Sequence, residues 1–237
     1  MALFLSPPSH SRSRHLSLSG LTHHPPSPSF TIPCPILLFF AVAKFAREQI
    51  APRVRAMDES ATMDPAVIRG LFDQGFMGIE IPERFGGVGS SFLSSCLVVE
   101  ELAKVDASVA VCVDVQNTLV NNVFKMWASP EIQERVYPRL AKDAIGSFCL
   151  SEPGSGSDAF ALRTRADRHS SGDYYTINGS KMWITNGGEA HYFLIMANVD
   201  PSKGYKGITC FLAERDMPGL VVGKKEDKLG IRASSTV

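Results

Sequence analysis

Two short segments of this 237-residue chain carry residue types that could bind a flat ligand with polar edges. The first, 148–158, holds two glycines and three serines, and the second, 181–185, holds a tryptophan and a threonine. Glycine lets a backbone approach a ligand closely and adopt positive φ, hydroxyl groups donate hydrogen bonds, and an indole offers an aromatic face. Together the segments predict a clasp for a planar cofactor, whereas the first alone could equally be a flexible surface loop.

Both segments resemble the signature motifs of the acyl-CoA dehydrogenases, flavoenzymes that desaturate acyl-CoA thioesters between the α and β carbons. The matching residues are Ser-Glu-Pro-Gly-Ser-Gly-Ser-Asp at 151–158 and Met-Trp-Ile-Thr-Asn-Gly at 182–187. Three further stretches extend the match: 100–108, 204–208 and 229–236. The chain is most similar to the short/branched-chain branch of the family, which implies a 2-methylbutyryl-CoA type of substrate and a place in isoleucine or fatty acid catabolism.

The resemblance implies FAD as the cofactor and assigns its contacts to the two motifs. The implied flavin-binding residues are Phe148, Cys149, Leu150, Ser151, Glu152, Pro153, Gly154, Ser155, Gly156, Ser157, Trp183, Ile184 and Thr185. Thr185 would donate toward flavin N5, where charge accumulates when a hydride arrives. Ser157 and Tyr205 match positions that contact the acyl-CoA, although Tyr205 could instead be a turn aromatic and Trp183 an ordinary strand aromatic.

The resemblance also sets expectations for the catalytic base and for partners. The family continues beyond the position of Val237 into further sheet and a helical bundle that carries the glutamate base. We therefore expect no catalytic residue within this chain, and low or no activity from a form truncated there. Glu152 and Glu189 are interpreted as solvated or strand-terminal carboxylates. The resemblance further implies electron transfer to an electron-transfer flavoprotein, a mitochondrial matrix location and a homotetramer for the full-length family.

Two alternatives stay open on the sequence. An acyl-CoA oxidase would share the fold but pass electrons to oxygen. A non-catalytic interaction module is the other reading, because Ser235-Thr236-Val237 resembles a C-terminal ligand for domains that capture strands and carboxylates.

Composition narrows the class of protein. Lysine plus arginine and aspartate plus glutamate balance at 24 each, so no global charge attracts nucleic acid or anionic membrane. The five cysteines form no C-x-x-C pair, which argues against a metal site or a disulfide framework and favours a reducing compartment.

Residues 1–35 differ in composition from the rest of the chain. Seven of the fifteen prolines precede residue 44, and the first acidic residue is Glu48. The absence of acidic residues and the presence of Arg12 and Arg14 suggest an organellar transit peptide, whereas the prolines would break its amphipathic helix. We expect 1–35 to be a disordered or targeting segment. The apolar run 36–43 is too short to span a bilayer.

Helix-start signals predict a helical domain over residues 36–142. Each candidate cap is a residue type that accepts a hydrogen bond from a helix N-terminus, and proline directly follows two of them. These caps are Asp64, Ser91, Asp106 and Ser129. Apolar residues then recur at helical spacing. Pro52 is expected to end the first helix, and Pro138 to kink or end the last.

After residue 143 the pattern changes to short β-prone runs separated by turn residues. The expected strands are 145–150, 161–167, 174–177, 181–185, 192–199, 208–213 and 220–223. Asn178-Gly179 is typical of a two-residue hairpin and would join strands 174–177 and 181–185. Helices followed by strands predict an α+β fold, with an all-α domain followed by a central antiparallel β domain at 143–237.

Overall fold

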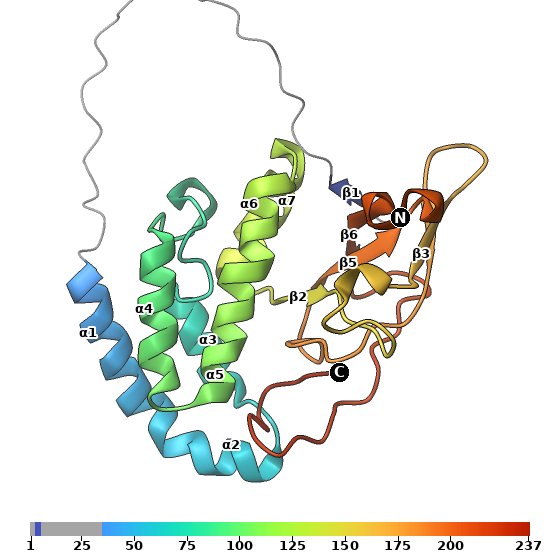
Figure 1. Cartoon of the computed structure of the whole chain (residues 1–237). Coiled ribbons are helices and arrows are strands. Elements are labelled where there is room, and N and C mark those ends of the chain that lie inside the picture. The colour runs from blue at the N-terminus through green and yellow to red at the C-terminus, as the bar shows by residue number, and fades with distance from the viewer. Residues whose placement is uncertain (1–2, 6–34) are drawn as a thin grey trace, which may run out of the picture.

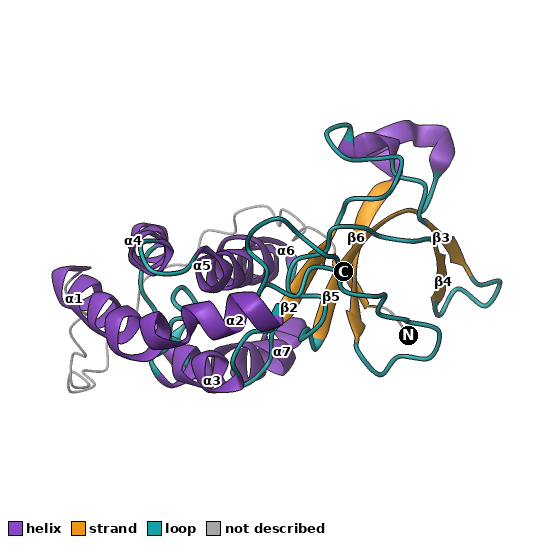
Figure 2. Ribbon diagram, turned by 90° about the horizontal axis from the view of Figure 1, so that it is seen from below, coloured by secondary structure: helices purple, strands orange, loops and turns teal. Residues whose placement is uncertain are grey.

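The computed structural model describes residues 3–5 and 35–237. Helices occupy one side of the molecule and a sheet the other, and strand β2 enters the sheet directly after the last helix (Figure 1). The view in Figure 2 shows the helices as a layer beside the twisted sheet. The predicted order of a helical domain followed by a β domain is confirmed.

The α-helices have the bounds α1 Pro35–Phe45, α2 Val54–Ser60, α3 Pro65–Asp73, α4 Phe92–Ala103, α5 Ala107–Asp114, α6 Asn122–Trp127 and α7 Pro130–Lys142. Helices α3, α4, α5 and α7 each begin directly after a predicted capping residue. Each predicted cap accepts a hydrogen bond from a backbone N–H of the first helical turn: Asp64, Ser91, Asp106 and Ser129. Pro138 lies inside α7 and does not end it.

Two π-helical segments continue helices instead of separating them. Ala46–Ile50 extends α1, and Val115–Asn121 joins α5 to α6. The first helix and its π-helical extension end at Ile50, two residues before Pro52. The 3-10 turn Ala51–Arg53 then leads directly into α2, so helical structure continues past the proline. A π-helical turn widens the backbone and often marks a functional position. Here the second segment presents three buried amide side chains, described below, toward the sheet and the connector after α3.

The sheet is mixed, which refines the expected antiparallel arrangement. Its strands are β1 Leu3–Leu5, β2 Gly146–Cys149, β3 Arg165–Arg168, β4 Tyr175–Asn178, β5 Tyr192–Asn198 and β6 Ile208–Glu214. The order is β1-β6-β5-β3-β4, with β2 also paired to β5. Antiparallel pairs are β1·β6, β5·β6 and β3·β4, whereas β2 and β3 each run parallel to β5.

Three expectations for the β domain are wrong. Residues 181–185 and 220–223 form no strand, and Asn178-Gly179 does not turn a hairpin between 174–177 and 181–185. Instead β4 pairs with the preceding strand β3. The backbone at Trp183 has φ 60°, so 181–185 cannot run as an extended ladder. Glycine is needed at 179 for a different reason, because an added Cβ there would overlap the Thr164 side chain.

The N-terminal segment also departs from expectation at one place. Leu3–Leu5 form β1 and pair with Leu212, Phe211 and Cys210 of β6. A short apolar run can satisfy the unpaired backbone groups at the edge of a sheet, which explains the pairing. The expectation of disorder or targeting for the other residues of 1–34 lies outside the described part of the chain.

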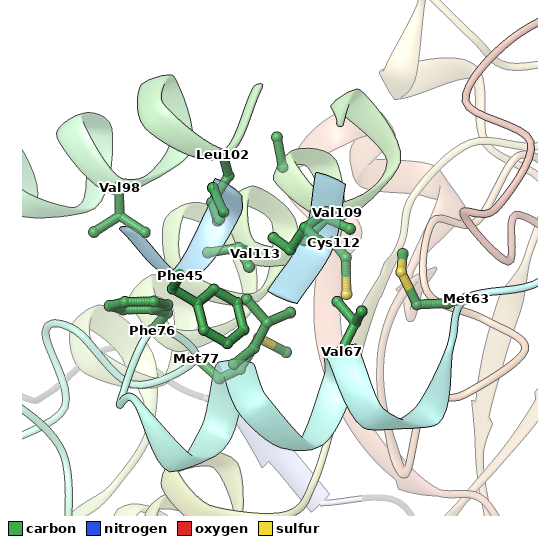
Figure 3. Packing of buried hydrophobic residues seen from close by; sticks show 14 of the residues in the cluster. Phe45, Met63, Val67, Phe76, Met77, Val98, Leu102, Val109, Cys112 and Val113 are labelled. Atoms are coloured by element: carbon green, nitrogen blue, oxygen red, sulfur yellow. The ribbon is translucent and has the colours of Figure 1, made fainter. Parts of the chain in front are cut away.

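Two hydrophobic clusters position the site. The first fills the helical domain, where Phe45, Phe76 and Leu102 pack together with the residues drawn in Figure 3. The second joins the domains, because Phe124 of α6 and Leu140 of α7 pack with Leu194 of β5 and Leu212 of β6. Since helices and sheet share this second cluster, β2 is held between rigid layers at the point where the chain leaves it for the glycine-serine segment.

Candidate functional site

The first motif leaves β2 and folds into a tight loop. Ser147 and Cys149 pair with Phe193 and Ile195 of β5, and the backbone of Glu152 then exchanges two hydrogen bonds with Ser155 at 2.9 and 3.0 Å. The Ser155 hydroxyl donates to the Asp158 carbonyl at 2.8 Å and closes the loop further. These hydrogen bonds hold the segment in a tight turn, which favours the binding reading over the flexible-loop alternative.

The loop presents an open glycine face. Gly154 and Gly156 are exposed, and an added Cβ at either position would have no atom within 4 Å. Neither has a positive φ, so that expectation is wrong and the glycines are not required by backbone conformation. Pro153 and Ser157 are also exposed beside them. The absence of side chains here leaves space in which the backbone can meet a flat ligand.

The structure brings the two motifs into direct contact. The Met182 N–H donates to the Ser151 carbonyl at 2.9 Å, and the Lys181 ammonium donates to the Leu150 carbonyl at 3.1 Å. Lys181 also pairs with the Glu152 carboxylate at 2.8 Å. Residues 150–152 are thus bonded along their length to 181–182, although about thirty residues separate them in the sequence.

Glu152 is not a solvated carboxylate, which corrects the expectation. It is 8% exposed and accepts hydrogen bonds from the Arg163 N–H at 2.6 Å, the Thr164 N–H at 3.0 Å and the Thr164 hydroxyl at 2.5 Å, besides Lys181. Burial acts to raise the pKa of this carboxyl, but the hydrogen bonds from Lys181, Thr164 and the two backbone N–H groups outweigh burial and lower the pKa to about 2.

Trp183 stands out from the second motif toward solvent. It is 53% exposed and adopts φ 60°, a left-handed conformation that is strained for a residue with a bulky side chain. Its neighbours hold it there, because Ile184 exchanges two backbone hydrogen bonds with Val237 at 2.7 and 3.1 Å. Strain that the surrounding structure maintains is a common property of ligand-binding positions.

Thr185 and the turn after it are braced from several elements. The Ser147 hydroxyl donates to the Thr185 carbonyl at 3.0 Å, and the Asn186 amide donates to the Cys112 carbonyl of α5 at 3.1 Å. Arg215, just after β6, donates to the carbonyls of 187, 188 and 190 at 2.7–3.3 Å. Within the described residues the Thr185 hydroxyl has no hydrogen-bond partner, so it is free to donate to a ligand.

Some predicted site residues face inward instead. Cys149 and Ile184 belong to a buried cluster with Phe193, and burial raises the pKa of the Cys149 thiol to about 12. Phe148 is half-buried and packs against the cluster that joins the domains. These side chains pack beneath the motifs, and Cys149 and Ile184 also line the cavity on the sheet.

The two candidate acyl-CoA contacts, Ser157 and Tyr205, lie on segments that touch each other. Tyr205, in the 3-10 segment Pro201–Gly207, is 58% exposed, and its ring lies 5.2 Å from that of Phe160, centroid to centroid. Phe160 follows Ser157 by three residues, so the loop that carries Ser157 and the segment that carries Tyr205 meet at this aromatic contact. Among the described residues, Phe160 is the aromatic partner of Tyr205, and more than half of Tyr205 stays open to solvent.

Sequence reasoning missed the residues that join the helical domain to β2. Gln116, fully buried, accepts from the Gly146 N–H at 2.9 Å and donates to the Ala144 carbonyl at 3.2 Å. The neighbouring amides Asn117 and Asn121 bond the connector after α3, through the Phe76 and Met77 carbonyls. The only sequence signal was a group of amides set between apolar stretches, and the partners of these three amides lie far away in the chain.

A cavity of about 760 Å³ lies on the sheet beside the second motif. Its lining includes Cys149, Lys181, Ile184, Phe193 and the apolar segment 217–223.

The remaining candidate groups among the described residues show no sign of catalysis or metal binding. His191 accepts a hydrogen bond from the Ile145 N–H at 3.2 Å, which is a structural role. In residues 3–5 and 35–237 no cluster of His, Cys, Asp or Glu could hold a metal ion. The helices of the same residues are too short or too polar to cross a membrane.

The helical and sheet domains share a buried cluster, and the glycine-serine and tryptophan motifs meet at the sheet side of it. Two family models match the chain in succession: the acyl-CoA dehydrogenase N-terminal domain at residues 37–144 and the acyl-CoA dehydrogenase middle domain at residues 147–237. The chain therefore belongs to the acyl-CoA dehydrogenase family.

Individual relatives agree with this assignment. The mitochondrial short/branched chain specific acyl-CoA dehydrogenase of Rattus norvegicus is 57% identical over 201 residues, which are 85% of this chain and 46% of the relative. Butyryl-CoA dehydrogenase of Megasphaera elsdenii is 35% identical with a TM-score of 0.81, covering 91% of this chain and 56% of that one. A glutaryl-CoA dehydrogenase of Mycobacterium smegmatis, in complex with FADH2, is 33% identical with a TM-score of 0.78, covering 85% and 50%. The chain spans about half the length of these relatives.

Proposed function

We propose that this chain supplies the flavin- and acyl-CoA-binding surface of a dehydrogenase for short, 2-methyl-branched acyl-CoA thioesters of the 2-methylbutyryl-CoA type. The single observation that carries the proposal is the contact of the two motifs through Lys181 and Met182. It places the open glycine face of 154–156, the exposed indole of Trp183 and the free hydroxyl of Thr185 on connected segments.

The residues fit FAD by their chemistry. A flavin needs an aromatic or backbone surface against its ring and donors along its polar edge. Trp183 supplies the ring surface, and Ser151 and Thr185 supply donors on the two bonded segments. FAD held by these residues would supply the acceptor for the hydride that leaves the β carbon of the acyl chain. The Thr185 hydroxyl would then stabilise the charge that collects near flavin N5.

The chain's own residues would mainly bind and orient. Ser157 and Tyr205, joined through Phe160, would hold the acyl-CoA at the open edge of the loop. Such holding matters because hydride transfer depends on the alignment of the reacting atoms. We assign the base that removes the α proton to no residue of this chain. His191 and Glu152 are already occupied by hydrogen bonds.

Partners and location follow from family membership and belong to the same proposal. An electron-transfer flavoprotein would reoxidise the flavin, and a homotetramer would be the assembled form. The rat relative carries the word mitochondrial in its name, which supports the mitochondrial matrix. The interaction-module alternative is disfavoured, because Ser235 and Thr236 are buried and Val237 bonds Ile184, so this segment is not offered to another protein.

Titration of the purified chain with FAD tests the proposal. We expect quenching of flavin fluorescence and a yellow protein after gel filtration. Thr185→Val should weaken binding, whereas Thr176→Val on the exposed face of β4 should not. Failure of the chain to retain any flavin would overturn the proposal. With flavin bound, oxygen uptake in place of dye reduction with 2-methylbutyryl-CoA would indicate an acyl-CoA oxidase.

A further inference from the structure

One ion pair connects the two motifs from inside the molecule. Lys181 and Glu152 side chains are 11% and 6% exposed, and their charged atoms lie 2.8 Å apart. Most of the other ion pairs among the described residues are far more open to water, as at Arg165 and Asp167, where both side chains are more than half exposed. A buried pair is expensive to form, and it is strongly destabilising to remove only one partner.

The bonds of this pair reach three separate segments. Lys181 bonds residues on both sides of Ser151, through the Leu150 carbonyl and the Glu152 carboxylate. Glu152 in turn holds the backbone N–H groups of Arg163 and Thr164, which lead into β3. The glycine-serine loop, the second motif and the entry to β3 are therefore joined at one carboxylate.

Without this pair, the motifs would still be linked by the packing of Cys149 against Ile184 and by the Ser147 hydroxyl on the Thr185 carbonyl, but those contacts lie before Leu150 and after Trp183. One backbone hydrogen bond, from Met182 to Ser151, is the remaining direct bond that the described residues show between 150–158 and 181–183. Trp183 directly follows this point and has the strained backbone that its neighbours must maintain. A loosened 150–152 segment would therefore shift the glycine face relative to the indole.

We propose that Glu152 and Lys181 are positioning residues, which hold the glycine-serine loop against the tryptophan segment so that one flavin can meet both. This inference rests on the proposed function. The Glu152 carboxylate is fully engaged by Lys181, Thr164 and the backbone of 163–164, which leaves none of its oxygens for a flavin. The inference also changes the role of Glu152 from the flavin contact that the motif match implied to a residue that positions the loop.

Exchange of single side chains in the full chain tests this role. Glu152→Gln and Lys181→Met each leave one buried charge unpaired, so we expect each to weaken FAD binding about tenfold. The double variant should bind no more weakly than either single variant, because the two residues act as a unit. Lys181→Arg keeps the charge and should recover part of the affinity. Asp167→Asn and Arg165→Met make the same chemical changes at an exposed pair and should stay within about twofold of the parent chain.

A positional readout separates this role from general destabilisation. In a Trp127→Phe background, Trp183 is the remaining tryptophan, and a nearby flavin quenches its emission. At saturating FAD we expect weaker quenching in Glu152→Gln than in the parent. A merely unstable but correctly arranged variant would be quenched fully once saturated. Equal quenching and equal affinity in all variants would overturn the positioning role while leaving the proposed function intact.

Hydrogen exchange provides a test that needs no flavin. The Met182 amide should be protected in the parent chain and exchange faster in Glu152→Gln and Lys181→Met, with Asp167→Asn unchanged. If the parent binds no FAD, the proposed function fails. Unchanged protection of the Met182 amide in these variants would then refute the claim that Glu152 and Lys181 hold the two motifs together. If exchange of the Met182 amide rises equally in every variant, including Asp167→Asn, the claim that this pair holds the motifs together is also refuted.

Discussion

Replacement of Gln116 by leucine should destabilise the chain more than its size suggests. The side chain is fully buried in the π-helical segment and accepts the Gly146 N–H at 2.9 Å while donating to the Ala144 and Leu140 carbonyls at 3.2 and 3.4 Å. Leucine has a similar volume, so no cavity is created. What is lost is the partner of a buried N–H and of buried carbonyls.

The magnitude follows from the cost of unpaired polar groups. One buried group without a partner costs about 1–3 kcal/mol, and the N–H of Gly146 loses its acceptor. The long bond to Leu140 contributes little, so we expect about 2–4 kcal/mol in total for Gly146 and Ala144. For a chain of this size that corresponds to a fall in Tm on the order of 4–15 °C.

Thermal melts followed by circular dichroism measure this effect. Gln133→Leu is the matched control, because Gln133 also donates to two helix carbonyls, at 3.0 and 3.1 Å, but is only half-buried. Water can replace its bonds, so its cost should stay below about 1 kcal/mol. Equal effects at the two positions would refute the reasoning that Gln116 joins the helical domain to β2.

Three further outcomes follow from burial and charge. The folded pKa of Glu152 lies below its ordinary value of 4.5, so its carboxylate stabilises the fold above that pH and loses this effect as pH falls toward about 2. The Tm difference between the parent and Glu152→Gln should therefore shrink over this window. The pKa of Glu189 shifts the other way, because burial raises it. The stability that its protonated form contributes is lost as pH rises through that pKa, so Glu189→Gln should raise Tm at about pH 7.5 more than at about pH 4. Gly146→Ala would force a Cβ into the Val120 side chain and should cost about 1–3 kcal/mol in urea unfolding.

Local signals predicted the helices well because caps depend on neighbouring residues. Asp64 bonds the N–H of Ala66, and Asp106 that of Val109, within three positions in each case. The strand expected at 181–185 was wrong because its conformation depends on distant partners. Ser151 and Val237 each bond this segment at one point and hold Trp183 in a left-handed turn, against the β preference of its residues.

The candidate site was predictable in part for the same reason. Motif resemblance located the two segments, and the structure brings them together. The residues that hold them were not predictable, since Arg215 and Asn186 act on carbonyls 25 to 74 positions away. Glu152 was misjudged because nothing in its sequence surroundings indicates that Lys181 and Thr164 will enclose it.

Trp183 allows the stability and binding roles of the second motif to be separated. Its φ of 60° costs free energy that glycine would not pay, and more than half of its side chain is exposed, so the indole adds little packing. Trp183→Gly should therefore leave Tm unchanged or raise it by about 1–3 °C. If the indole serves as a flavin surface, the same change should weaken FAD binding about tenfold.

Ala61 is the control for this change, because it has a similar φ of 52° at the end of α2, in the helical domain. Ala61→Gly should raise Tm by a comparable amount and leave FAD affinity unaltered. A fall in Tm of more than about 4 °C in Trp183→Gly would mean that the indole supports the fold. Stability gained at both positions, with affinity lost only at 183, would mean that the chain tolerates this strain to keep an aromatic ring where a ligand can reach it.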